Sequence, residues 1–180
     1  MNTKVIRISQ DSTKLTREEE AGLRQAAGIL KRGGLVAFPT ETVYGLGGDA
    51  LNPESARKIY AAKGRPSDNP LIIHISRFED IRNIVKTLPE TAVKAAEAFW
   101  PGPLTMILDK SAIVPPETTG GLDTVAVRFP SHPVARQLIA YSGGYIAAPS
   151  ANLSGKPSPT SARYVQEDMA GRIEMIVDGG

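Results

Sequence analysis

The stretch LVAFPTETVYGLGGDA, residues 35–50, joins an apolar run to a segment rich in hydroxyl groups and glycine. Its first four residues predict a short buried strand. The dozen positions that follow hold two threonines, a glutamate, a tyrosine and three glycines, which is more glycine than an ordinary turn needs. We therefore expect the segment after residue 38 to be a loop that closes over a ligand.

Strands and helices are predicted to alternate on both sides of this segment. TREE at 16–19 is a capping box that should start a helix, and Asn52-Pro53 should start another that ends at Gly64. The alternation indicates an α/β layer fold. Further strands are expected at 71–76, 104–108, 124–129, 145–148 and 173–177, and further helices near 78–85, 89–99, 132–141 and 160–169.

Composition excludes several classes of function. The chain has 180 residues, 41% of them hydrophobic, which suits one domain with one core. It carries 21 basic and 19 acidic residues, so its net charge of +2 gives no general attraction to nucleic acid or membrane. It has no cysteine, which excludes thiolate catalysis, disulfides and zinc-thiolate sites. With no signal peptide or membrane span in the sequence, we expect a soluble cytoplasmic protein.

Two common nucleotide motifs are disfavoured in the glycine-rich segment. GLGGDA satisfies G-x-G-x-x-A, the dinucleotide-binding fingerprint, which should follow a strand directly and open a helix. Here PTETVY separates it from the preceding strand, and the next helix is expected to begin only at Pro53. The segment also lacks the Gly-Lys-Ser/Thr ending of a P-loop.

A second polar segment, KGRPSDNP at 63–70, carries two cations. Gly64 breaks the helix and Pro66 favours an extended Arg65, so Lys63 and Arg65 should point to one side. Such a pair suits a polyphosphate, and the alternative is a solvated surface turn. In either case we expect both cations on an exposed loop, where replacement by alanine leaves thermal unfolding nearly unchanged.

A third polar segment, APSANLSG at 148–155, follows a predicted strand. Ser150 and Asn152 should face one way in extended chain, at the carboxyl end of a strand where α/β proteins bind ligands. The alternative is a turn stabilised by local hydrogen bonds.

Two predicted strands each place a polar side chain of interest. His74 lies opposite three apolar neighbours, and a lone strand histidine is more often structural than catalytic. Thr124 and Arg128 share one face of the strand at 124–129. Because an arginine within a sheet needs an anionic partner, Arg128 should meet either a protein carboxylate or a ligand carboxylate.

The chain resembles the YrdC-like threonylcarbamoyl-adenylate synthases over roughly residues 20–165, in five ordered segments: PTETVYGLG, KGRP-x-x-NPL, WPGPLT, VAVR-x-P and APSAN-x-SG. The resemblance implies a YrdC-like fold, a single-domain α/β structure with a twisted, mostly mixed β-sheet flanked by helices. It also implies formation of threonylcarbamoyl-AMP and pyrophosphate from L-threonine, bicarbonate and ATP, with Mg²⁺ accompanying the ATP. The product would serve N6-threonylcarbamoylation of adenosine 37 in ANN-decoding tRNA.

The resemblance also implies roles for individual residues. Lys63 and Arg65 would be catalytic, and no residue is expected to bind a metal directly. Threonine would be bound by Thr42, His74, Arg128 and the backbone at Ala148. ATP would be bound by Lys63, Arg65, Asn69, Thr124, Ser150, Asn152 and Ser158.

The resemblance further implies partners and a domain boundary. The product would pass to downstream threonylcarbamoyl-transfer proteins, with a contact to tRNA. Family members continue beyond the strand that matches IEMIVDGG with residues that complete both sites, whereas this sequence ends at Gly180. We expect residues 1–180 to form one YrdC-like catalytic domain, shortened at its C-terminus.

Two other functions remain open at this stage. An RNA-binding module with this fold would use lysines and arginines on the tRNA backbone, although a net charge of +2 argues against non-specific RNA binding. A carbamoyl-transfer domain of the hydrogenase-maturation type shares the fold but normally lies within much longer chains.

Overall fold

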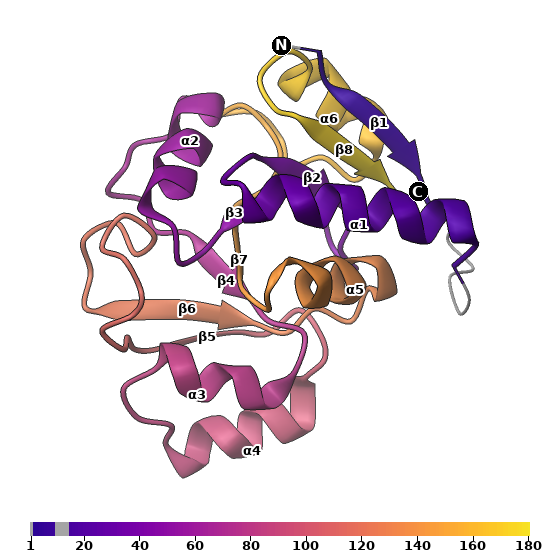
Figure 1. Ribbon diagram of the computed structural model, residues 1–180. Coiled ribbons are helices and arrows are strands. Elements are labelled where there is room, and N and C mark those ends of the chain that lie inside the picture. The colour runs from indigo at the N-terminus through magenta and orange to yellow at the C-terminus, as the bar shows by residue number, and fades with distance from the viewer. Residues whose placement is uncertain (1, 10–14) are drawn as a thin grey trace.

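The computed structural model describes residues 2–9 and 15–180. These residues form an eight-stranded mixed sheet in the order β1-β8-β2-β3-β7-β4-β6-β5 (Figure 1). The strands are β1 (Lys4–Arg7), β2 (Val36–Phe38), β3 (Gly45–Asp49), β4 (Ile72–His74), β5 (Thr105–Asp109), β6 (Thr124–Arg128), β7 (Ile146–Ala148) and β8 (Met175–Asp178). The helices are α1 (Arg17–Lys31), α2 (Pro53–Lys63), α3 (Ile81–Ile84), α4 (Glu90–Phe99), α5 (Pro133–Ser142) and α6 (Ala162–Met169), with a 3-10 turn η1 (Phe78–Asp80). The predicted α/β fold with a mixed sheet flanked by helices is confirmed.

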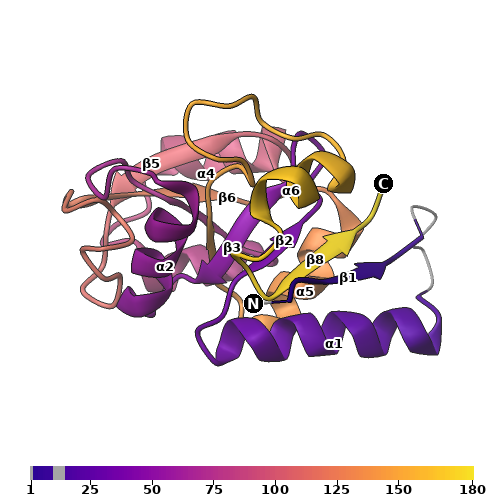
Figure 2. The ribbon, with the colours of Figure 1, turned by 90° about the horizontal axis from the view of Figure 1, so that it is seen from above.

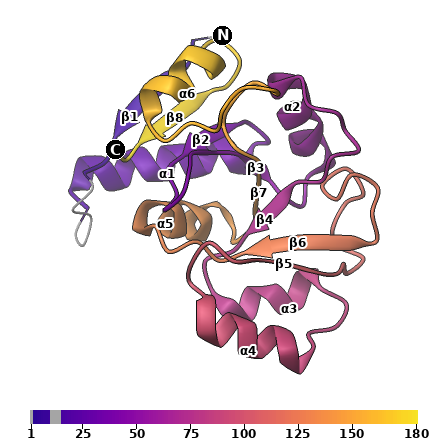
Figure 3. The same cartoon turned by 180° about the vertical axis from the view of Figure 1, so that it is seen from behind.

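Helices cover the two faces of the sheet unequally. Helices α1 and α5 lie side by side and pack on β2, β7 and β8 (Figures 1 and 3). Helices α2, α3, α4 and α6 contribute to the core on the other face. The core under α1 and α5 does not extend to the far strands: Ile107 of β5 is 70% exposed there, and Ala126 of β6 is partly exposed. We call this side of β4, β6 and β5 the open face.

The helix starts follow the predicted capping chemistry. The Thr16 hydroxyl accepts from the Glu19 amide and the Glu19 carboxylate accepts from the Thr16 amide, so the capping box is complete. The Asn52 side chain caps α2 by accepting from the Glu54 amide. Gly64 then ends α2 in the left-handed conformation, with a φ of 61°.

The expectation of a loop throughout the glycine-rich segment is wrong. Its second half, Gly45–Asp49, is the buried strand β3, which pairs antiparallel with β2 and with β7. A Cβ atom on Gly47 would lie 2.8 Å from a methyl carbon of Ile146 and 2.9 Å from the Phe38 ring. The glycines therefore allow β3 to pack closely against neighbouring elements, and the segment does not need them for unusual backbone conformations.

Strand β1 has no counterpart among the sequence predictions. It lies at the edge of the sheet beside β8, and three of its four residues are exposed (Figure 2). Its four residues pair with residues 175–178, at the other end of the described chain. A short exposed strand with so distant a partner leaves no clear periodic pattern.

No helix of the described residues combines the length and apolarity needed to cross a membrane.

The close packing of β3 predicts the effect of one added methyl group. Gly47→Ala should lower the free energy of unfolding by about 1–3 kcal/mol, because Phe38 and Ile146 leave no room for the methyl. Gly22→Ala in α1 is the matched control, since its Cβ would meet only the side chain of Ile6 and alanine favours helix. Denaturant unfolding of both variants measures the difference, and equal stability would contradict the packing role.

Candidate functional site

The open face brings three of the predicted site residues onto two neighbouring parallel strands. His74 at the end of β4 is paired in register with Arg128 at the end of β6. Thr124 lies four residues before Arg128 and therefore on the same side of β6, as predicted. The carboxyl ends of parallel strands are the usual place for ligand-binding side chains.

Arg128 meets a protein carboxylate, one of the two kinds of partner that the sequence left open. Its Nη2 donates to Glu41 Oε1 at 2.7 Å and to the Thr42 hydroxyl at 3.1 Å. The side chains of Arg128 and Glu41 are only 11% and 20% exposed. The Nε of Arg128 is buried and has no acceptor among the described residues. This places predicted residue Thr42 beside Arg128, and it adds Glu41, which the sequence analysis did not single out.

His74, which is in register with Arg128, is buried and neutral. Its Nδ1 lies 3.1 Å from the carbonyl oxygen of Ile72, and a carbonyl can only accept, so Nδ1 carries the proton. Its ring packs edge-on against Phe38 with 6.0 Å between ring centroids. Burial, and then the positive charge of Arg128, lower the pKa of His74 to about 4. His74 therefore carries no positive charge near neutral pH.

Lys63 is not on an exposed loop, and that prediction is wrong. It is the last residue of α2 and is only 2% exposed. Its ammonium donates to the backbone carbonyl oxygens of Ser150 and Asn152. Burial, and then the charge of Arg65, lower the pKa of Lys63 to about 8. Lys63 lies four residues after the buried Ile59, on the face of α2 that packs inward, so its side chain enters the interior.

Arg65 engages a different segment from Lys63. Its Nη2 donates to Asn69 Oδ1 at 2.7 Å and to the Pro70 carbonyl at 3.2 Å. Arg65 is partly exposed and Asn69 is exposed, so both remain within reach of solvent. The two cations thus hydrogen-bond to two separate turns, Lys63 to the turn after β7 and Arg65 to the turn at Asn69 and Pro70. They still lie close enough for the charge of Arg65 to lower the pKa of Lys63.

The turn after β7 is organised mainly by its own backbone. Predicted residue Ala148 ends β7 and is buried, and Ser150 forms an isolated bridge with Gly45. The Asn152 side chain donates to the carbonyls of Leu153 and Lys156, while its Oδ1 is buried with no partner among the described residues. The side chain of Asn152 therefore faces the turn, as the local hydrogen-bond alternative proposed.

Predicted residue Ser158 lies at the side of this turn. It is exposed and lines a pocket of about 360 Å³. The pocket is formed by residues 156–160 together with Tyr164, Glu167 and Asp168 of α6. None of the other predicted site residues lines this pocket.

Tyr44 links the separate parts of the site, and the sequence analysis gave it no role. Its backbone donates to the Pro159 carbonyl and accepts from the Ala151 amide. Its hydroxyl donates to the Gly180 carbonyl at 2.9 Å and accepts from the Gly179 amide at 3.1 Å. Burial raises its pKa to about 12. Tyr44 therefore joins the PTETV segment to the turn after β7 and to the end of β8.

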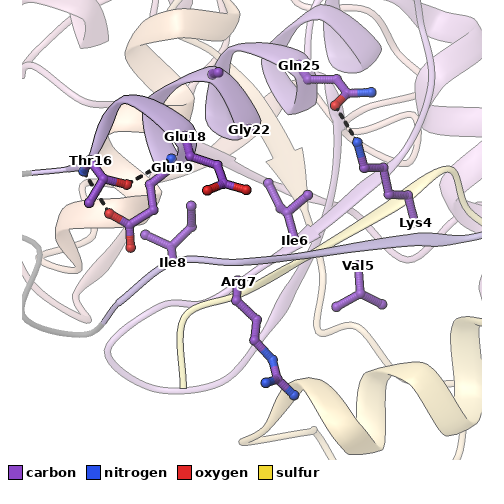
Figure 4. Close-up of a pocket in the computed structure, with 11 residues that line it drawn as sticks. Lys4, Val5, Ile6, Arg7, Ile8, Thr16, Glu18, Glu19, Gly22 and Gln25 are labelled. Atoms are coloured by element: carbon purple, nitrogen blue, oxygen red, sulfur yellow. Dashed lines mark hydrogen bonds between the residues drawn. The ribbon is translucent and has the colours of Figure 1, made fainter.

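A larger pocket, of about 680 Å³, lies elsewhere, between β1 and the N-terminal half of α1 (Figure 4). Its polar residues are partly satisfied by one another: Lys4 donates to Gln25, and Thr16 and Glu19 form the helix cap. It shares no residue with the predicted site.

Among the described residues, no group of three or more His, Asp or Glu side chains is arranged to hold a metal ion.

Comparison with known proteins identifies the family. Residues 28–180 match the Sua5/YciO/YrdC family, whose description reads "Telomere recombination". The chain belongs to this family. A family member named threonylcarbamoyl-AMP synthase, from Pyrococcus abyssi, is 60% identical over 164 residues, which cover 91% of this chain and 48% of the relative. Another of that name, from Bacillus subtilis, is 55% identical over 159 residues, covering 88% of this chain and 46% of the relative.

A solved structure of the family has the same fold. The crystal structure of P. abyssi Sua5 complexed with L-threonine is 56% identical, with a TM-score of 0.93. The match covers 99% of this chain and 51% of that chain. The chain therefore spans about half the length of these Sua5/YciO/YrdC relatives.

The buried ammonium of Lys63 predicts a pH dependence of stability. Its folded pKa is about 8, below the ordinary lysine value of 10.5, so the unfolded state binds more protons between these values. Stability contributed by Lys63 should therefore rise with pH across this window. Relative to Lys63→Met, the wild type should gain on the order of 2 kcal/mol in unfolding free energy between pH 8 and 10.5. A constant difference between the two proteins across the window would contradict the buried position of the charge.

Proposed function

We propose that this protein is an L-threonylcarbamoyladenylate synthase, which makes threonylcarbamoyl-AMP and pyrophosphate from L-threonine, bicarbonate and ATP. The observation that carries the proposal is the buried Arg128 on the open face, beside the Thr42 hydroxyl and the neutral His74. A guanidinium held in this way is suited to a ligand carboxylate. Membership of the Sua5/YciO/YrdC family, and a relative whose structure contains threonine, support the amino acid as that ligand.

The proposed chemistry asks the protein mainly to position substrates. The amine of threonine attacks bicarbonate and water leaves, or it attacks carbon dioxide derived from bicarbonate and a proton leaves, and either route forms a carbamate. A carbamate oxygen then bonds to the α-phosphorus of ATP while the bond to the β-phosphate oxygen breaks, and pyrophosphate leaves. No covalent intermediate with the protein is required, so alignment of the reactants and stabilisation of negative charge supply the catalysis.

The described contacts refine the role of each proposed residue. Arg65 and Asn69 are accessible and would meet ATP phosphates, with Thr124 on the open face and Ser150 and Ser158 from the turn after β7. Lys63 would act differently, because its ammonium is already held by two carbonyl oxygens. It would fix the turn at Ser150 and Asn152 and add positive charge behind it. The threonine would lie against Thr42, His74, Arg128 and the backbone of Ala148.

Mg²⁺ would accompany ATP in this proposal. The described residues offer no cluster of three acidic or imidazole ligands, so the phosphate oxygens and water would hold the ion. The product is a reactive mixed anhydride, so it would pass to a threonylcarbamoyl-transfer protein that modifies adenosine 37 of ANN-decoding tRNA. We place this work in the cytoplasm, where those substrates meet.

Mass spectrometry tests the proposal directly. The protein is incubated with threonine, bicarbonate, Mg²⁺ and ATP, and threonylcarbamoyl-AMP is expected only when all four are present. Arg65→Ala should reduce its formation by roughly a hundredfold, because a phosphate-facing charge is lost. Arg7→Ala in β1, whose side chain is 90% exposed and is not among the proposed site residues, is the control.

Two results would contradict the synthase function. One is absence of the adenylate from the complete reaction. The other is turnover of carbamoyl phosphate without any use of threonine and bicarbonate, which would instead favour carbamoyl transfer. Affinity for RNA that falls steeply with salt, in a protein without synthase activity, would favour an RNA-binding module.

A further inference from the structure

Glu41 and Arg128 form an ion pair at the position proposed for the amino acid, and the inference that follows rests on the proposed function. The Arg128 Nη2 to Glu41 Oε1 distance is 2.7 Å. Arg128 is buried, whereas Glu41 lies at the surface with its side chain 20% exposed, and Glu41 precedes the proposed threonine residue Thr42. The site therefore contains a fixed negative charge beside its positive one before any ligand arrives.

The local charges sum to zero in the free protein. Burial raises the pKa of Glu41, but the hydrogen bond from Arg128 and those from backbone amides outweigh this, so the net direction is down and Glu41 is ionised. His74 is neutral because its pKa is lowered to about 4. Burial also lowers the pKa of His132, whose charge would otherwise lie close enough to Glu41 to matter. One guanidinium and one carboxylate remain.

A site whose charges sum to zero should favour a ligand that is itself neutral overall. A simple carboxylic acid would place a second anion beside Glu41 and give this partly buried site a net charge of minus one, which is unfavourable. An α-amino acid brings a carboxylate and an adjacent ammonium, so the sum stays zero. The guanidinium can still donate to another carboxylate, because Nη2 alone makes the contacts to Glu41 and Thr42, and Nε has no acceptor among the described residues.

We propose that Glu41 determines specificity for an α-amino acid, by binding the ligand's ammonium group while Arg128 binds its carboxylate. The side-by-side charges of the pair complement the side-by-side charges of the zwitterion. Glu41 thereby holds the nitrogen next to the carboxylate that fixes the rest of the ligand, and this ammonium must release a proton to solvent before it attacks bicarbonate as the neutral amine. A different role is that Glu41 only occupies Arg128 until a ligand carboxylate displaces it.

Calorimetric binding of two ligands separates these roles. One is L-threonine, and the other is the α-hydroxy acid in which a hydroxyl replaces the amino group of threonine. The wild type should bind threonine at least about tenfold more tightly than the hydroxy acid. Glu41→Gln should weaken threonine binding by about tenfold or more and should leave hydroxy-acid binding equal or tighter, so the selectivity is lost.

Controls keep each outcome informative. Glu54→Gln in α2 removes an exposed carboxylate from an ion pair with Arg57 and should leave both affinities unchanged. Thermal unfolding shows whether Glu41→Gln folds, and the wild-type comparison of the two ligands does not depend on that variant. Equal tightening of both ligands in Glu41→Gln overturns the proposal in favour of simple displacement. Unchanged selectivity also overturns it.

The outcome also distinguishes this inference from the proposed function. If the wild type binds threonine and makes the adenylate but does not discriminate against the hydroxy acid, Glu41 has no such role and the synthase function stands. If the wild type binds neither ligand and makes no adenylate, both proposals fail.

Discussion

The close approach of β3 to its two neighbours is the constraint on which the site depends. Strand β3 joins the half of the sheet that contains β1, β8 and β2 to the half that contains β7, β4, β6 and β5. Neither Phe38 of β2 nor Ile146 of β7 leaves room for a Cβ on Gly47. The segment that enters β3 is thereby held against the end of β6, where Glu41 and Thr42 contact Arg128.

Two buried cations lie on opposite sides of this junction, and the protein compensates them differently. Arg128 has a carboxylate partner, so its charge is offset by a full negative charge. Lys63 has only backbone carbonyl oxygens, and burial accordingly lowers its pKa. A charge satisfied by dipoles alone costs more to bury than a paired one. Burying the Lys63 ammonium therefore lowers the stability of the fold, although its hydrogen bonds hold the turn at Ser150 and Asn152. Arg128, in contrast, forms part of a neutral pair.

Tyr44 connects these two arrangements. Its backbone meets the turn after β7, and its hydroxyl holds the backbone at the end of β8. The PTETV segment, the Ser150 turn and the residues after β8 are consequently fixed relative to one another by one buried side chain. The open face, which carries Thr124 and Arg128, is left uncovered because α1 and α5 pack on β2, β7 and β8 instead.

Local patterns were sufficient for much of the secondary structure and for part of the site. Capping residues such as Thr16 and Asn52 act within one helical turn, so their effect can be predicted from neighbouring residues. The alternation along β6 likewise places Thr124 and Arg128 on one face whatever the rest of the fold. Ordered motifs in the chain also pointed to the family that the comparisons then showed.

Tertiary structure decided the features that depend on distant partners. Glycines in residues 45–49 are compatible with a loop or a strand until β2 and β7 pack against them. The burial of Lys63 depends on carbonyls nearly ninety residues away in the chain. The partner of Arg128 is equally remote, since Glu41 lies 87 residues earlier. Charge compensation of this kind depends on distance in space, and spacing along the sequence does not reveal it.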